Sequence, residues 1–400
     1  MLYATVILAA VLAAVVIELA SRWRIRRTKA YYVRRPFERI HMTLDRTAFP
    51  DLAAVSRVEI NAEGERGDPL PINRDGLYRV LVAGGSAAEC GLLDQSATWP
   101  AVLQDELRSG RRLKALGARR VHVGNIGRSM MTAEAVFTML ECTLPRYEKL
   151  DLLILMVGLS DVVDWLEKGA PATIPGGAVD LDGIFAVYPG AKFRWSIRGS
   201  AATRIGLQAL RRFVGKTYYR KNAGSRYVEL RRRRRQAARW IDNAPDPAPM
   251  LAHFEKYLCR IVSLAEAKGA RVVFARQPWS HREPAAAKQR LMWNFCASPI
   301  VFEKPGPPAA YYTAAASDAL LLTCDRHWAA LAASLGITQV DLCAAVPAGD
   351  RNFYDELHFT AAGALLAAQA IAAAIIEPKI NAEIEHDVRQ TGLVSAGCAT

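Results

Sequence analysis

The chain has 400 residues, of which 51% are hydrophobic and 23% are charged. This composition suffices for one large domain with a buried core, and it excludes a globally disordered chain, which would be poorer in apolar residues. The formal net charge is +13 at pH 7. Because the basic excess is clustered, it favours contact with an anionic surface such as phospholipid headgroups or nucleic acid.

The first 21 residues have the properties of a membrane anchor. Leu2 to Ala20 are almost wholly apolar, with Glu18 as the one charged side chain. At 1.5 Å per residue, about 19 helical residues approach the thickness of the bilayer hydrocarbon. A cleaved signal peptide is the alternative, but its positive charge normally precedes the apolar stretch, whereas here the charge begins at Arg22. We predict an uncleaved signal-anchor helix over residues 1–21.

A basic cluster follows the apolar stretch directly and suits a membrane surface. Basic flanks favour the cytoplasmic side, so the charge asymmetry favours a cytoplasmic domain, although large domains cross membranes despite their charge and the side stays open. The cluster consists of Arg22, Arg24, Arg26, Arg27 and Lys29. Residues 22–76, which contain four prolines, are predicted to be a basic flank and linker.

Between residues 77 and 376, short apolar runs alternate with helical patterns, as in a parallel sheet covered on both faces. The predicted strands are 78–83, 120–124, 152–157, 271–275 and 337–342. The predicted helices are 99–108, 133–144, 250–268, 314–335 and 360–376, and Gly269 is a helix-stop signal. We expect a three-layer α/β/α sandwich with a five-stranded, mostly parallel, flavodoxin-like sheet, in addition to the transmembrane helix.

Residues 164–249 interrupt this alternation, because they are far longer than one helical crossover. The segment is rich in aromatic and basic residues and is predicted to be an inserted cap or lid. Its arginine run, Arg231 to Arg235, is either a surface for anions or a solvated helix face. Residues 377–400 are predicted to be a loosely ordered tail.

Candidate catalytic residues follow the first and last predicted strands, and sites in open parallel sheets form at the carboxyl ends of strands. Two glycines precede Ser86, so the serine is expected at a tight turn near a helix N-terminus. Asp355 and His358 lie three residues apart, just before the closing helix. At this spacing the carboxylate can orient the imidazole, which can take a proton from a serine hydroxyl. We expect the Ser86 turn and the His358 loop to meet.

Four ordered blocks resemble those of the SGNH (GDSL-like) hydrolase superfamily. That family has a GDS-like block with the nucleophile, an NxGxxG-like block, a GxND block and a DxxH block. The corresponding segments here are Gly84 to Ser86, Asn125 to Met130, Gly158 to Asp161, and Asp355 to His358. The resemblance covers about residues 78–375 without most of the insertion. It implies a serine hydrolase with Ser86 as nucleophile, His358 as general base and Asp355 as its orienting carboxylate.

The resemblance also implies an oxyanion hole, and the sequence departs from the family in it. The expected donors are the backbone N–H of Ser86, the N–H of the second-block glycine position and an asparagine side chain in the third block. Met130 occupies the glycine position and Ser160 the asparagine position, with Gly127 as an alternative to Met130 if the loop register shifts. A position that needs positive φ would be strained with methionine.

The leading interpretation is an esterase acting on O-acyl groups of a lipid, a glycan or a small ester. The alternatives are an O-acyltransferase in polysaccharide modification and a membrane-bound scaffold with a catalytically weak site. No cofactor or metal is expected, since the cysteines lack CxxC spacing, and Asp161 reads as a helix cap. The predicted partners are an acyl-ester substrate and the membrane, without nucleic acid; the oligomeric state is left open.

Overall fold

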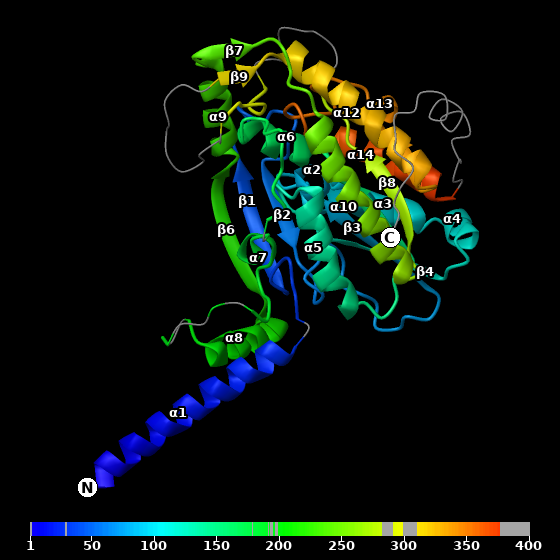
Figure 1. The fold of residues 1–400 in the computed structure, drawn as a ribbon. Coiled ribbons are helices and arrows are strands. Elements are labelled where there is room, and N and C mark those ends of the chain that lie inside the picture. The colour runs from blue at the N-terminus through cyan, green and yellow to red at the C-terminus, as the bar shows by residue number, and fades with distance from the viewer. Residues whose placement is uncertain are drawn as a thin grey trace.

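The computed structural model describes residues 2–28, 30–177, 179–190, 192, 195–196, 199–281, 291–298 and 310–376. A five-stranded sheet forms the centre of the domain, and a long N-terminal helix projects from it (Figure 1). The strands are β3 (Leu77–Gly84), β4 (Arg120–Asn125), β5 (Leu152–Met156), β8 (Arg271–Arg276) and β10 (Thr338–Asp341). Their order is β10-β8-β5-β3-β4, and every neighbouring pair is parallel. This is the predicted flavodoxin-like arrangement, so the fold-class prediction is confirmed.

The strands are apolar throughout because both faces of the sheet are covered. Val80 and Val82 of β3 join one hydrophobic core, while Leu81 and Ala83 join the other. This alternation is the two-residue period of a strand. Helices α5 (Ala133–Thr143), α6 (Leu159–Glu167), α10 (Ala248–Ala267) and α12 (Ala314–Ser334) contribute to the second core, and α2 (Ser86–Glu89), α3 (Trp99–Leu107), α13 (Leu342–Ala345) and α14 (Ala361–Ile376) to the first.

Side-chain caps explain why several helices begin where the sequence predicts. Thr98, Thr132 and Thr313 each accept a hydrogen bond from a backbone N–H in the first turn of α3, α5 and α12 respectively. Such a cap typically stabilises a helix by about 1 kcal/mol. Gly269 follows the end of α10 with φ +77°, which confirms it as a stop signal.

The segment predicted as a linker is instead part of a second sheet, so that prediction is wrong. Strand β1 (Glu38–Leu44) pairs antiparallel with β2 (Val55–Glu59) and parallel with β6 (Lys216–Ala223) of the insertion. Met42 and Val58 are buried together in a small core of their own. Figure 1 shows this sheet beside the central one. The prolines of the segment lie outside its strands.

The insertion is folded, and it contacts the domain through two of its arginines. It contains α7 (Leu181–Ile184), α8 (Ala201–Val214), β6, α9 (Ser225–Arg235) and β7 (Arg239–Ile241), which pairs with β9 (Ala310–Tyr312). Arg231 and Arg234 are buried and donate to four backbone carbonyls, those of Ala48, Tyr354, Asn294 and Tyr312. These two side chains fix α9 to the domain, so the arginine run is not simply a solvated face or an anion-binding surface.

Helix α1 (Leu2–Arg27) is long and apolar enough to cross a membrane and is the one such helix in the described part of the chain. It continues past the predicted end at residue 21 and carries the arginines on its last turns. The remaining short helices are η1 (Gln95–Ala97), α4 (Gly110–Ala115) and η2 (Leu144–Arg146). The predicted tail, 377–400, lies outside the described residues.

Candidate active site

Ser86 lies at the carboxyl end of β3, as the first residue of α2. The turn requires glycine, because a Cβ on Gly84 would lie 2.1 Å from the carbonyl oxygen of Met156 on β5. Gly85 N–H donates to the same oxygen at 3.2 Å, which fixes the turn against the neighbouring strand. Ser86 is partly exposed, and its position at a helix start leaves its N–H available to an anion.

Asp355 and His358 form a buried, hydrogen-bonded pair. The His358 Nδ1 lies 2.8 Å from Asp355 Oδ2, and Asp355 also accepts from the backbone N–H of Leu357 and His358 and from Trp293 Nε1. Burial raises the pKa of Asp355, but the charge of His358 and these hydrogen bonds outweigh it, so the pKa lies below its ordinary value. The carboxylate can only accept, and therefore the Nδ1 of His358 carries a proton; in the neutral imidazole Nε2 then has a lone pair.

Aromatic rings enclose the His358 imidazole. Tyr354 and Trp293 stack on it with centroid distances of 5.5 and 6.4 Å, and Tyr227 of α9 presents its edge at 6.2 Å. Burial lowers the pKa of His358, but the charge of Asp355 and its hydrogen bond outweigh it, and the pKa lies above its ordinary value. Within the described residues, the buried Nε2 has no hydrogen-bond partner.

The helix that begins with Ser86 lies near the His358 loop, and the meeting of the two side chains stays a prediction. Ala87 and Ala88 of α2 share one hydrophobic core with Tyr354. Glu89, one helical turn after Ser86, is close enough for its charge to help raise the pKa of His358. No hydrogen bond joins the Ser86 hydroxyl to His358, since Nε2 is unpartnered among the described residues. In catalytic sites without substrate, the hydrogen bond between nucleophile and base is often long or unformed.

Ser160 and Gly127, two of the predicted oxyanion donors, lie in different environments. A Cβ on Gly85 would lie 2.5 Å from the Ser160 Oγ, so the Ser160 hydroxyl lies directly against the residue preceding Ser86. The Gly127 N–H donates to Asn125 Oδ1 at 2.7 Å, which removes Gly127 as an alternative donor. Met130 therefore stays as the second-block candidate.

Met130 adopts a left-handed backbone conformation, with φ +62°. Glycine visits this region freely, whereas a side chain there costs roughly 1–2 kcal/mol. Met130 is 38% exposed and belongs to none of the hydrophobic cores of the described residues, so we expect little packing to offset that cost. Residue 130 thus has a backbone conformation that glycine adopts freely, but it carries a methionine side chain.

We expect Met130→Gly to raise the free energy of unfolding by about 0.5–1 kcal/mol, because the relief of strain exceeds the added entropy of the unfolded chain. Urea titration of the full-length chain in detergent micelles measures the change. The neighbouring Met131→Gly is the matched control; Met131 packs on a hydrophobic core and has ordinary φ, so its replacement is expected to destabilise. Equal losses of stability from both variants would contradict the strain at residue 130.

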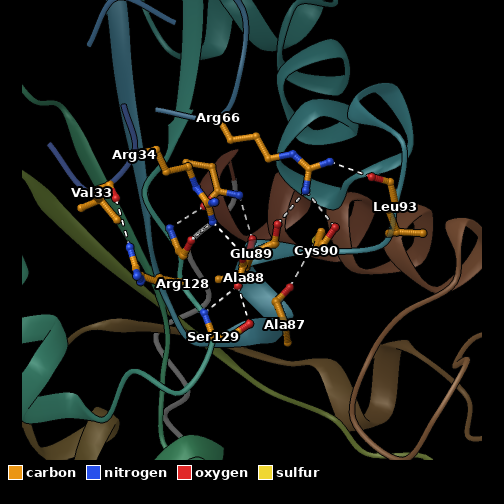
Figure 2. Close-up of polar contacts among 12 residues, drawn as sticks. Val33, Arg34, Arg66, Ala87, Ala88, Glu89, Cys90, Leu93, Arg128 and Ser129 are labelled. Atoms are coloured by element: carbon orange, nitrogen blue, oxygen red, sulfur yellow. Dashed lines mark hydrogen bonds and ion pairs between the residues drawn. The ribbon is translucent and has the colours of Figure 1, made fainter. Parts of the chain in front are cut away.

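A polar network holds α2 against the second-block loop, and sequence reasoning missed it (Figure 2). Glu89 accepts from the N–H of Ser129 at 2.6 Å, from the Ser129 hydroxyl and from Arg34 at 2.8 Å. Burial raises the pKa of Glu89, but Arg34 and Ser129 together lower it to about 2. Arg66 donates to three carbonyls around the end of α2, those of Glu89, Cys90 and Leu93. The helix that begins with Ser86 is thereby fixed at its far end.

Asp161 caps a neighbouring helix, in agreement with its predicted role. Its carboxylate accepts from the N–H of Ala133, the first residue of α5, at 2.9 Å. Burial raises the pKa of Asp161 to about 7. The side chain thus fixes the start of α5 next to the third block, which carries Ser160.

Comparison with known proteins gives matches in structure but none in sequence: no family model and no curated protein matches the chain. Similar solved structures include an acetylxylan esterase from Geobacillus stearothermophilus, at 13% identity and a TM-score of 0.39, over 75% of this chain and 94% of that one. Another is described as a GDSL-like lipase from Parabacteroides merdae, at 12% identity and a TM-score of 0.39, over 75% and 95%. At these identities the likeness concerns the fold alone.

Proposed function

We propose that the chain is an ester hydrolase in which Ser86, His358 and Asp355 act as a catalytic triad. The observation that carries the proposal is the buried Asp355–His358 pair, whose Nε2 has no hydrogen-bond partner among the described residues and which lies near enough to the Ser86 helix to feel the charge of Glu89. A serine hydroxyl is a weak nucleophile at neutral pH and needs such a base.

The reaction follows from these positions. His358 Nε2 takes the proton of Ser86 as its Oγ attacks the ester carbonyl, and the resulting imidazolium is stabilised by Asp355. The same proton then passes to the leaving alcohol, which gives an acyl-serine. Water, deprotonated by His358, attacks the acyl-serine and releases the acid and the free serine. Both halves pass through an oxyanion.

The oxyanion donors in this proposal are the N–H groups of Ser86 and Met130 and the hydroxyl of Ser160. Within the described residues, no hydrogen bond diverts the Met130 N–H or the Ser160 hydroxyl. One such donor typically contributes about 2.7–4 kcal/mol to the transition state. Because a serine hydroxyl reaches less far than an asparagine amide, we expect Ser160 to contribute toward the lower end of this range or through a bridging water.

The substrate is proposed to be an O-acyl ester of a lipid, a glycan or a small molecule at the membrane. The location of the substrate at the membrane depends on α1 being kept as an uncleaved anchor. Glu18 of α1 is buried and accepts from the N–H groups of Ala201 and Ala202 at 3.0 Å, so cleavage of α1 would remove a cap from α8. The arginines at the end of α1 favour placing the domain in the cytoplasm.

Acyl transfer to an alcohol is the second candidate. His358 is only 4% exposed, beneath Tyr227 of α9. A site that excludes water favours an alcohol over water as the acceptor of the acyl group. Product analysis with an added sugar or glycerol separates the two, since transfer yields a new ester and hydrolysis yields only free acid.

Labelling by a fluorophosphonate tests the proposal directly, because the probe reacts with an activated serine. The labelling rate is expected to rise with pH as His358 loses its proton, with an apparent pKa above 6.5, since the pKa of His358 is raised. The rate is measured with the full-length chain across pH 5 to 9. His358→Ala is expected to abolish labelling. Labelling that persists in this variant would refute an activated Ser86.

A further inference from the structure

Helix α8 of the insertion presents an apolar stripe to solvent. Leu207, Leu210, Phe213 and Val214 recur at the spacing of one helix face, and all four are exposed, Phe213 to 88%. The side chains on the flanks of the stripe include Arg204 and Arg211, and the last turn also carries Arg212. Soluble domains rarely expose a contiguous apolar patch of this kind. We therefore expect the apolar face of α8 to be covered by a binding partner.

The position of α8 relative to α1 points to the occupant. Glu18 receives the first two N–H groups of α8 and also Arg22 Nε at 2.7 Å, so the start of α8 is fixed to α1 (Figure 1). Glu18 lies 16 residues after Leu2 in the helix, about 24 Å along its axis at 1.5 Å per residue. That distance approaches the hydrocarbon thickness of about 30 Å, which places α8 at the depth of the membrane interface.

Aromatic and basic side chains surround this junction. Arg22 stacks on Trp195 at 4.4 Å and Arg27 on Trp23 at 4.3 Å, and both tryptophans are exposed. Tryptophan and arginine in such pairs are typical of the headgroup region, where the ring and the charge meet different surroundings.

A groove of about 280 Å³ separates the end of α1 from α8. Arg24 lines it from α1, and Arg204 and Arg212 line it from α8, with Ile25 and Ile205 as apolar neighbours. Burial lowers the pKa of Arg204, and the nearby charge of Arg35 lowers it further. Like charges gathered around one groove are stabilised by an anion, and guanidinium groups match a phosphate well.

We propose that α8 lies in the membrane interface, with its apolar stripe among the acyl chains, and that the α1–α8 groove binds the phosphate of an anionic phospholipid. The occupant is therefore lipid, held in continuity with the α1 anchor. The proposal rests on α1 spanning the membrane and is independent of the chemistry at Ser86. Its consequence is a domain fixed to the bilayer at two points, which restricts the orientation of the site.

Fluorescence in vesicles tests the position of α8. An environment-sensitive dye is attached to Phe213→Cys in the full-length chain, reconstituted into phosphatidylcholine with phosphatidylglycerol. We expect a blue-shifted emission that doxyl-labelled lipid quenches. The control is the dye on Tyr219→Cys of β6, which is 77% exposed and lies beyond α8, and is expected to emit as in water without quenching. Background labelling of the native cysteines is measured in the wild-type chain.

Lipid preference tests the groove. Spin-labelled phosphatidylglycerol is expected to be immobilised more than spin-labelled phosphatidylcholine, and Arg24→Gln or Arg212→Gln to reduce that preference about fivefold each. Arg111→Gln on α4, an exposed arginine outside the groove, is the control and should leave it unchanged. An unchanged preference in both groove variants overturns the phosphate site.

Two further outcomes overturn the position of α8. A blue shift at residue 213 without doxyl quenching indicates a second copy or another protein as the occupant, and a water-like emission indicates no occupant. Flotation with the vesicles in alkaline carbonate checks the anchor separately. Failure to float removes the anchor and this inference together, while fluorophosphonate labelling still reports on Ser86.

Discussion

Replacing Ser86 by alanine is expected to lower kcat for nitrophenyl ester hydrolysis by about 10⁴- to 10⁶-fold, because the acyl-serine can no longer form. Residual turnover comes from the oxyanion donors and from binding. Stability should change little, since Ser86 is partly exposed and its hydroxyl makes no hydrogen bond within the described residues. Steady-state kinetics of the full-length chain in detergent, with a panel of short- and medium-chain esters, measures the effect.

Ser109→Ala is the matched control for this experiment. Ser109 is an exposed serine that precedes α4 and makes no side-chain cap hydrogen bond, so its removal is expected to leave activity and stability unchanged. If the wild type and Ser86→Ala hydrolyse every ester and acylated glycan at the same rate, the catalytic role of Ser86 is lost, and a scaffold with the same fold becomes the better interpretation.

The central sheet can be predicted because the sequence of each strand indicates a buried strand by itself, without knowledge of its neighbours. Strands such as β5 are apolar at every position, and buried parallel strands have this pattern regardless of their partners. Strand β1 lacks it, since its apolar residues alternate with polar ones, and its partner β6 lies in the insertion. The alternation in β1 is short, and nothing in either segment identifies the distant partner, so the sequence predicts a linker where a second sheet forms.

The residues of the candidate site also fall into two groups, those that the sequence predicts and those that it does not. Ser86, Asp355 and His358 can be found from the sequence because each lies next to a strand or helix end with its own glycine or cap signal. Glu89 and Arg34 cannot, because the ion pair joins α2 to the stretch predicted as a linker. The contact of the Tyr227 ring with His358 depends on the docking of α9 by its buried arginines. A run of arginines has the same sequence pattern whether its side chains are buried or solvated, so the docking of α9 cannot be predicted from the sequence.

The insertion links the two ends of the domain. In chain order, α8 lies against α1, β6 extends the second sheet, and α9 covers His358. One continuous segment therefore contains the proposed membrane-facing helix and contacts the proposed catalytic base. If α8 binds lipid as inferred, helix α9 beside the proposed site is attached to the bilayer through β6, which suits a substrate that arrives from the membrane.

Asp355→Asn is expected to lower kcat by about 10⁴-fold with little change in the position of the residue. The substituted side chain would present an amide N–H₂ to groups that now donate to the carboxylate. If that amide donates to Nδ1, the imidazole proton moves to Nε2, which can then no longer take the proton of Ser86. Loss of the charge also lowers the pKa of His358, so the acidic limb of the pH–rate profile should move to lower pH.

The same substitution should also destabilise the fold, because every partner of Asp355 is a donor. Trp293 Nε1 donates to Oδ2 and two backbone N–H groups donate to Oδ1, so the new amide faces a donor in either orientation, at a cost of about 1–3 kcal/mol. Adding Trp293→Phe removes one of these donors and keeps a ring against His358. We expect the double variant to recover stability relative to Asp355→Asn while kcat stays low. Recovery of kcat together with stability would show that Asp355 serves the fold and does not orient the base.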